Sequence, residues 1–255
     1  MITKRKVIPI ISLLALFIGP AIATAGEPDP TLIIDRMVDA MRGDSSYAEM
    51  TMRIERPRYT REVAMRSWSK DRNYSLVLIT LPARDRGTVY LMRDRDIWTY
   101  DPRIDRITRL PSSMLAQSWM GSDFTNDDLI RDTDPVEDYQ HQLLRTEEYQ
   151  GYESYVIDMT PKPDRPIVWG KVRVWVSSSN YLQLRAEHYD QRGDLVNTME
   201  FDQITRFGQR ELPARITVIP ADKQNERTIL TYEEADFNID IDADFFSRAT
   251  MQRLR

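Results

Sequence analysis

The sequence predicts a mainly β protein with a few helices, built as one large, curved antiparallel sheet. Apolar and polar residues alternate with a period of two in segment after segment, and turn residues separate these segments. Such segments number roughly eleven or twelve, well above the usual share of strand. One amphipathic helix precedes them, and a short apolar helical stretch interrupts them. A sheet of this size has to curl or close to manage its edges.

The N-terminus has the order of residues that is typical of a secretory signal peptide. Lys4-Arg5-Lys6 precedes an apolar run from Val7 to Ile18, and the small residues Ala23-Thr24-Ala25 follow it, so we expect cleavage after Ala25. An uncleaved anchor is the alternative, but the run is shorter than the ~20 residues of a membrane span. We therefore predict a signal peptide at residues 1–25 and one domain at residues 26–255.

The composition excludes several classes of function. Removing residues 1–25 takes away three cations and no anions, which changes the formal net charge from −5 to −8. A chain this acidic is not expected to bind nucleic acid. The absence of Cys excludes disulfides, a thiol nucleophile and lipidation near the cleavage point. We expect a soluble mature protein, periplasmic if the host is a Gram-negative bacterium.

The domain opens with an amphipathic helix. Asp29-Pro30 supplies a cap and a first-turn proline, and Gly43 ends the segment. Ile33, Met37 and Met41 recur between them at helical spacing. The alternation then predicts a first group of strands at residues 48–55, 62–68, 74–81, 88–92, 97–100 and 104–110.

A short apolar stretch then interrupts the strands. Residues 112–119 contain neither Pro nor Gly and are predicted to make about two helical turns, with Gly121 as the positive-φ stop. Thr125 and Asp128 have the spacing of a capping box at the start of a second helix. The stretch carries many apolar side chains for its length, so it has to cover either a core or a bound ligand. These side chains include Met114, Leu115, Trp119, Met120, Phe124 and Leu129.

The period-two pattern returns after this interruption. It predicts strands at residues 140–149, 152–159, 171–176, 181–189, 195–204, 216–219 and 227–232, and a short terminal helix within residues 242–254. The proline-rich residues 161–166 are interpreted as a long hairpin connection and not as a domain boundary.

The sequence contains few residues that suggest catalysis. His141 and His188 each lie in a strand-like segment, and we interpret both as solvent-facing or hydrogen-bonded residues and not as ligands or bases. Residues 240–251 begin like a calcium loop but have Phe245 and Met251 where that loop needs glycine and glutamate. We therefore predict no catalytic residues, no cofactor and no metal; an enzyme with a dispersed site stays an alternative.

The apolar residues are more informative than the polar ones. Eleven Met and five Trp lie after residue 25, and methionine suits a surface that accepts ligands of varied shape. The alternative is that each of them fills the core. Trp98 and Tyr100 closely precede the apolar stretch, so we include both in a predicted lipid-binding and lid group with the six apolar residues named above.

The chain resembles the LolA-like outer-membrane lipoprotein-sorting family, in its longer periplasmic branch associated with lipid exporters. The resemblance rests on the signal peptide, the first helix, the strand meander and Met120-Gly121-Ser122-Asp123-Phe124-Thr125-x-x-Asp128-Leu129. It adds Gly121, Ser122, Asp123 and Asp128 to the predicted site as motif residues. It implies an unclosed β-barrel capped by short helices, as in LolA and LolB, with an apolar cavity for acyl chains. Arg53, Arg56, Arg58 and Arg61 all remain candidates for the arginine that contacts the lid in this family.

The resemblance also implies a function. The expected protein is a non-enzymatic periplasmic carrier of an acylated lipoprotein or lipid. It would receive this cargo from an inner-membrane ABC or RND-type exporter and deliver it to an outer-membrane acceptor. The alternative is a regulatory binding module of the same fold that docks on a membrane signalling protein.

Overall fold

The computed structural model describes residues 28–93, 96–126, 128, 134–165 and 167–254. The predicted signal peptide and Leu129 lie outside these residues. The first helix is present as predicted: α1 (Pro30–Arg42) begins at the N-cap Asp29, whose carboxylate accepts a hydrogen bond from the Thr31 amide, and it ends at Gly43. Among the helices of the described residues, none combines the length and the apolar character that a membrane span requires.

The described residues form one antiparallel sheet of thirteen strands. The first six strands are β1 (Ser45–Arg56), β2 (Tyr59–Lys70), β3 (Tyr74–Leu81), β4 (Val89–Arg93), β5 (Asp96–Asp101) and β6 (Arg106–Arg109). The other seven are β7 (Tyr139–Tyr149), β8 (Tyr152–Pro161), β9 (Lys171–Ser177), β10 (Gln183–Tyr189), β11 (Leu195–Phe207), β12 (Arg210–Pro220) and β13 (Arg227–Phe237).

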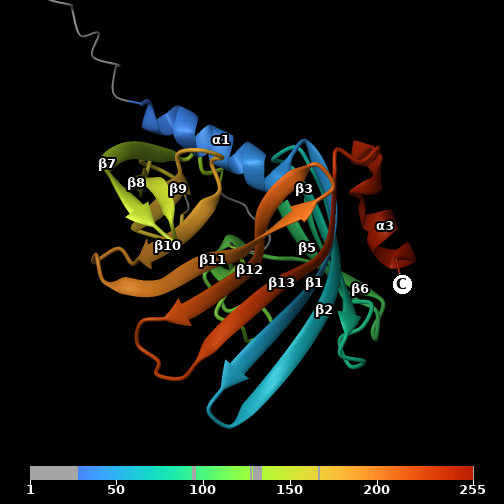
Figure 1. Ribbon diagram of the computed structural model, residues 1–255. Helices are drawn as coiled ribbons and strands as arrows, with labels where there is room; N and C mark the ends of the chain where they lie inside the picture. The colour runs from blue at the N-terminus through green and yellow to red at the C-terminus, as the bar shows by residue number, and fades with distance from the viewer. Residues whose placement is uncertain (1–27, 94–95, 127, 129–133, 166, 255) are drawn as a thin grey trace, which may run out of the picture.

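The order of the strands explains how the chain encloses a space. The order across the sheet is β6-β5-β4-β3-β2-β1-β13-β12-β11-β10-β9-β8-β7, and every neighbouring pair is antiparallel. The chain therefore starts in the middle of the sheet, meanders to one edge at β6, and meanders back to the middle from the other edge at β7. Among the described residues no pairing joins β6 to β7, so the curved sheet is an unclosed barrel (Figure 1).

The concave face of the sheet and α1 share the main hydrophobic core. Buried residues from both halves of the sheet belong to one cluster, which is possible because the sheet curves round to bring them together. Ile33, Ile34, Met37 and Val38 of α1 belong to the same cluster. In Figure 1 the helix lies across one open end of the curved sheet.

A second, smaller core lies on the convex face of the sheet. Leu76, Leu78, Val89 and Leu91 pack there against the C-terminal segment, which contains the 3₁₀ turn η2 (Ala243–Phe245) and helix α3 (Arg248–Arg253). This explains why β3 is apolar at consecutive positions: Val77 and Ile79 face the main core, while Leu76 and Leu78 face the second one. A strand that is covered on both faces loses the alternation of a half-exposed strand.

Two predicted elements differ from the structure. Residues 112–119 do not make two helical turns: the structure has one 3₁₀ turn, η1 (Ser112–Met114), followed by turns. The strand predicted at residues 216–219 is too short, because β12 begins at Arg210 and includes Pro213. Proline has no backbone N–H to donate to a neighbouring strand. For this reason the sequence around Pro213 did not indicate a strand.

The convex core gives a first prediction. Phe246 is fully buried between Tyr74 and Phe245, so we expect Phe246→Ala to lower the free energy of unfolding by about 3–5 kcal/mol. Gln252→Ala, on the exposed side of α3, is the matched control and should change it by less than about 0.5 kcal/mol. Urea titration of the three proteins measures both values. Equal stabilities would show that the C-terminal segment does not dock on the sheet.

Candidate functional site

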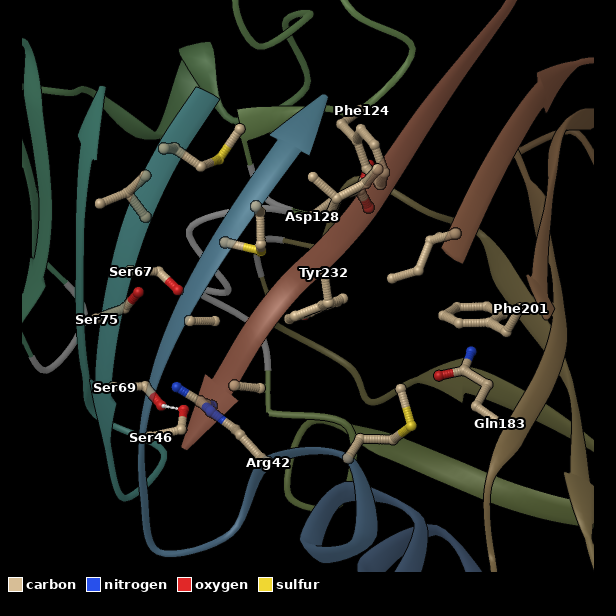
Figure 2. Close-up of a pocket in the computed structure, with 18 of the residues that line it drawn as sticks. Arg42, Ser46, Ser67, Ser69, Ser75, Phe124, Asp128, Gln183, Phe201 and Tyr232 are labelled. Carbon is tan, nitrogen blue, oxygen red and sulfur yellow. Dashed lines mark hydrogen bonds between the residues drawn. The ribbon is translucent and has the colours of Figure 1, made fainter. Parts of the chain in front are cut away.

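The concave side encloses a cavity of about 220 Å³ between α1, the sheet and the segment that leads from β6 to β7. A second cavity of about 150 Å³ shares four lining residues with it, Met41, Asp128, Gln183 and His188. The main core therefore leaves space between its side chains. Figure 2 shows Phe124 and Asp128 at one end of the larger cavity and Arg42 and Ser46 at the other.

Small side chains create this space. Ser46 on β1, Ser69 on β2 and Ser75 on β3 are direct cross-strand neighbours, so they form one row across three strands. In the next row, Ala48 lies opposite Ser67. Cores are normally packed to the density of organic crystals. Where two adjacent rows of the concave face carry small residues, the side chains from the opposite side of the curved sheet do not fill the space above them.

The roof of the cavity is the connection between the two edge strands. We call residues 112–126 together with Asp128 the crossover segment. Its centre is a tight turn in which the Ser122 amide donates to the Trp119 carbonyl at 2.9 Å, with φ of 50° at Met120 and 77° at Gly121. Two successive positive φ angles are the geometry of a type I′ turn, which explains the glycine. The Trp119 amide donates to the Phe124 carbonyl at 2.8 Å and closes the loop.

Ser122 holds the inside of this loop. Its buried hydroxyl donates to the Trp119 carbonyl at 2.7 Å and accepts from the Phe124 amide at 3.2 Å. The Ser122 hydroxyl therefore provides hydrogen bonds to backbone groups for which the turn supplies no backbone partner. As a result Phe124 is directed into the cavity.

Asp123 fixes the segment to the middle of the sheet. Its carboxylate forms a two-pronged ion pair with Arg56 at the end of β1, with Nη1–Oδ2 and Nη2–Oδ1 distances of 2.9 and 3.0 Å. The side chains of Arg56 and Asp123 are only 10% and 4% exposed. Thr228 on β13 donates its hydroxyl to the same carboxylate at 2.7 Å and accepts from the Asp123 amide at 3.0 Å. Breaking a buried pair of this kind leaves an uncompensated charge.

Two arginines bind the backbone of the turn. Arg56 donates to the Gly121 carbonyl at 3.1 Å, and Arg61 donates to the Met120 carbonyl at 2.9 Å. Arg61 also pairs with Asp85 at 2.7 Å. Arg53 instead pairs with Glu55 and Glu62 at the surface. Of the four arginines that the sequence left open, the structure brings Arg56 and Arg61 to the crossover segment.

The predicted capping box is present at the end of the segment. The Thr125 amide donates to the Asp128 carboxylate at 2.8 Å, and the Asp128 amide donates to the Thr125 hydroxyl at 3.1 Å. Asp128 then lines both cavities beside His188. The imidazole of His188 is buried against Trp169, its Nδ1 lies 2.9 Å from the Asn197 side-chain oxygen, and burial lowers its pKa.

The other predicted site residues fall into distinct environments. Leu115 and Trp119 are buried in the main core, where Trp119 packs on Tyr90 with 5.3 Å between ring centroids. Met114 and Met120 are partly buried. Of the predicted group, Phe124 and Asp128 line the larger cavity.

The placement of Trp98 and Tyr100 in the same group is wrong. Both belong to the convex core with Phe246 and Met251. The reason is the period of the strand: on β5, Ile97 faces the main core, so Trp98 and Tyr100 face the opposite side of the sheet. Nearness in sequence to the crossover segment did not indicate the face.

Within the described residues, the His, Asp and Glu side chains form no group of three that could hold a metal ion. The two histidines are both hydrogen-bonded, as expected: His141 contacts the Thr31 hydroxyl at 3.1 Å and the Pro135 carbonyl at 2.8 Å. The arrangement provides a cavity beneath the crossover segment that is lined by both apolar and polar side chains.

Comparison with known proteins gives the same architecture. A family model described as "Uncharacterized protein" matches residues 71–253. No curated protein matches the chain significantly. A LolA superfamily protein from Nitrosomonas europaea is 27% identical with a TM-score of 0.76, over 88% of this chain and 100% of that one.

Two further solved structures are similar. An outer membrane lipoprotein-sorting protein domain from Vibrio parahaemolyticus is 22% identical with a TM-score of 0.79, over 88% of this chain and 98% of that one. A DUF1329 family protein from Desulfovibrio piger is 24% identical with a TM-score of 0.80, over 88% of this chain and 100% of that one.

Fold and site together define a class of protein: an open half-barrel whose concave face holds a cavity under a helix and a crossover segment. Within that class, the chain belongs to the family whose model matches residues 71–253, and it has the fold of the LolA superfamily protein and of the outer membrane lipoprotein-sorting protein domain described above.

The ion pair of the crossover segment gives a second prediction. Arg56→Ala should lower the free energy of unfolding by about 3–5 kcal/mol, because it leaves the buried Asp123 carboxylate without its cation. It should also speed amide hydrogen exchange at residues 119–124. Arg53→Ala is the matched control on the same strand and should cost at most about 1 kcal/mol, because its pairs are exposed. Protected amides in the Arg56→Ala protein would contradict the role of this pair.

His188 gives a third prediction. Burial lowers its pKa below the ordinary value of 6.5, so below about pH 6.5 the unfolded chain binds a proton that the folded chain does not. The free energy of unfolding should therefore fall as the pH decreases from about 7 to about 5. In His188→Gln this decrease in the free energy of unfolding should be smaller than in the wild type. Burial lowers the pKa of His141 as well, so His141→Gln measures the separate contribution of that histidine. Urea titrations between about pH 5 and pH 7 measure the free energy of unfolding of each protein. The prediction is wrong if the free energy of unfolding of His188→Gln depends on pH as strongly as that of the wild type.

Proposed function

We propose that the protein is a non-enzymatic carrier that binds the acyl chains of a lipid or lipoprotein in the cavity beneath the crossover segment. The observation that carries the proposal is the cavity of about 220 Å³ on the concave side, next to the residues of the main core. Much of its wall is apolar: Met50, Met65, Val77, Phe124, Phe201, Ile216 and Leu230. Each methylene buried against such a wall contributes about 0.8 kcal/mol.

The size of the cavity implies that the roof moves when cargo binds. At about 220 Å³ it is smaller than the roughly 300–1,000 Å³ of typical ligand sites. The larger and smaller cavities adjoin at Met41, Asp128, Gln183 and His188, so a displaced crossover segment would join them. We infer that the structure represents a closed state, in which the Arg56–Asp123 pair and the Arg61 contact hold the crossover segment in place.

The remaining steps follow from the family. We propose that residues 1–25 are a cleaved signal peptide and that residues 26–255 work in the periplasm. There the protein would receive its cargo from an inner-membrane exporter of the ABC or RND type and pass it to an outer-membrane acceptor. Transfer needs no energy source in this protein if the acceptor binds the cargo more tightly.

A cavity-filling variant tests the proposal. Ser67 faces the cavity opposite Ala48, so a phenylalanine at this position would occupy the space that cargo needs. We expect mass spectrometry of organic extracts to find acylated molecules with the wild-type protein purified from the periplasm and to lose them with Ser67→Phe. Arg66→Phe, the next residue on the exposed face of the same strand, is the matched control and should retain them. Wild-type protein that carries no acylated molecule would reject the carrier function.

A further inference from the structure

Three polar side chains lie where the two cavities of the concave side adjoin. Asp128 of the crossover segment and Gln183 and His188 of β10 line both the larger and the smaller cavity. We call these three residues the polar junction. Apart from Tyr139, the other described residues that line the smaller cavity are apolar. An alkyl chain alone would gain nothing from the polar junction, so the junction indicates a polar group in the ligand.

His188 provides a hydrogen-bond acceptor at this junction. The residue is only 7% exposed, and its Nδ1 atom lies 2.9 Å from the side-chain oxygen of Asn197. That oxygen can only accept, so Nδ1 carries the proton and donates it to this hydrogen bond. Burial, which lowers the pKa of His188, favours the neutral ring, in which the other nitrogen, Nε2, is an acceptor. Among the described residues Nε2 has no hydrogen-bond partner.

The Asp128 carboxylate is a second acceptor. Its Oδ2 atom accepts a hydrogen bond from the Thr125 amide at 2.8 Å. Within the part of the chain that the structure describes, no arginine, lysine or histidine forms an ion pair with it. Its charge acts on the pKa of His188 in the direction opposite to burial, so the two side chains are near neighbours. Two acceptors cannot form a hydrogen bond with each other, and a donor between them would bind both.

The charge at the junction disfavours an anionic head group there. Among the described residues that line the two cavities, Arg42 is the only arginine or lysine, and it lies at the opposite end of the larger cavity from Asp128 (Figure 2). A carboxylate or phosphate at the junction would therefore meet a like charge and a lone pair. The Gln183 amide, which forms no hydrogen bond with the described residues, can accept from a donor as well.

We propose that the polar junction binds the head group of an apolar ligand through hydrogen bonds that the head group donates, as a hydroxyl or an ammonium group does. This inference deepens the proposed carrier function and rests on it. It assigns the cargo as a lipid-like alcohol or amine. The apolar part of the ligand packs on the walls on either side of the junction. These walls include Met50, Met65, Ile216 and Leu230 in the larger cavity and Met159, Val172 and Val174 in the smaller one.

Two pairs of ligands with chains of equal length test this assignment, and only the first member of each pair donates a hydrogen bond. The neutral pair is 1-decanol and methyl decanoate, and the cationic pair is decylammonium and decyltrimethylammonium. Competition with a fluorescent apolar probe bound to the delipidated protein measures each affinity. We expect the donor to bind at least roughly tenfold more tightly than its counterpart in one or both pairs. The pair with the larger difference identifies the head group as a hydroxyl or an ammonium group.

A pair of matched variants tests the role of the junction. Asp128→Asn removes its charge and replaces one acceptor oxygen by a donor. This change should remove most of the advantage of the donor ligands and leave the affinity for methyl decanoate unchanged. Asp71→Asn makes the same substitution in the exposed turn between β2 and β3, and it should bind all four ligands like the wild type.

The outcomes separate this inference from the proposed function. If the wild-type protein binds both members of each pair equally well, the donor-binding junction is wrong and the carrier function stays in place. If it binds none of the four ligands, both are wrong. The comparison within each pair uses the wild-type protein alone, so it decides the matter even if Asp128→Asn fails to fold.

Discussion

The path of the chain between the two edges of the sheet is the constraint on which the cavity depends. Because the strands run outward to β6 and return from β7, the residues between them have to pass from one edge to the other. In a sheet this curved, the short way leads across the concave side. The buried Arg56–Asp123 pair then holds the crossing segment against β1 and β13 in the middle of the sheet, so the roof is anchored at its centre.

The same curvature separates two cores with different properties. The convex core is filled by Phe246 and Met251, and its residues have ordinary structural roles. The concave core has to be filled from several directions by α1, the crossover segment and the opposite wall. Where Ser46, Ser69, Ser75, Ala48 and Ser67 replace larger residues, that filling is incomplete. A more tightly filled core would provide more stability, but here the core keeps a cavity of about 220 Å³.

The crossover segment combines strong local order with few attachments to the sheet. Hydrogen bonds of the Ser122 side chain stabilise its turn, in which Met120 and Gly121 have positive φ angles. The segment can therefore move as a unit. Its described polar attachments to the sheet come mainly from Arg56, Arg61 and Thr228. A rigid unit on a few polar contacts opens at lower cost than a segment that has to unfold. The proposed carrier function requires this property of the segment that covers the cavity.

The sequence by itself determined the local structure: the first helix with its caps, most strands, the turn at Gly121 and the capping box at Thr125 and Asp128. These depend on residues close together along the chain, and period, φ preference and capping chemistry are visible in one segment. Only the tertiary structure decided which face of β5 carries Trp98, which arginines reach the crossover segment, and that serines from three strands form one row beside Arg42. Those facts depend on strand register and on the curvature of the whole sheet, which bring together residues that are far apart in sequence.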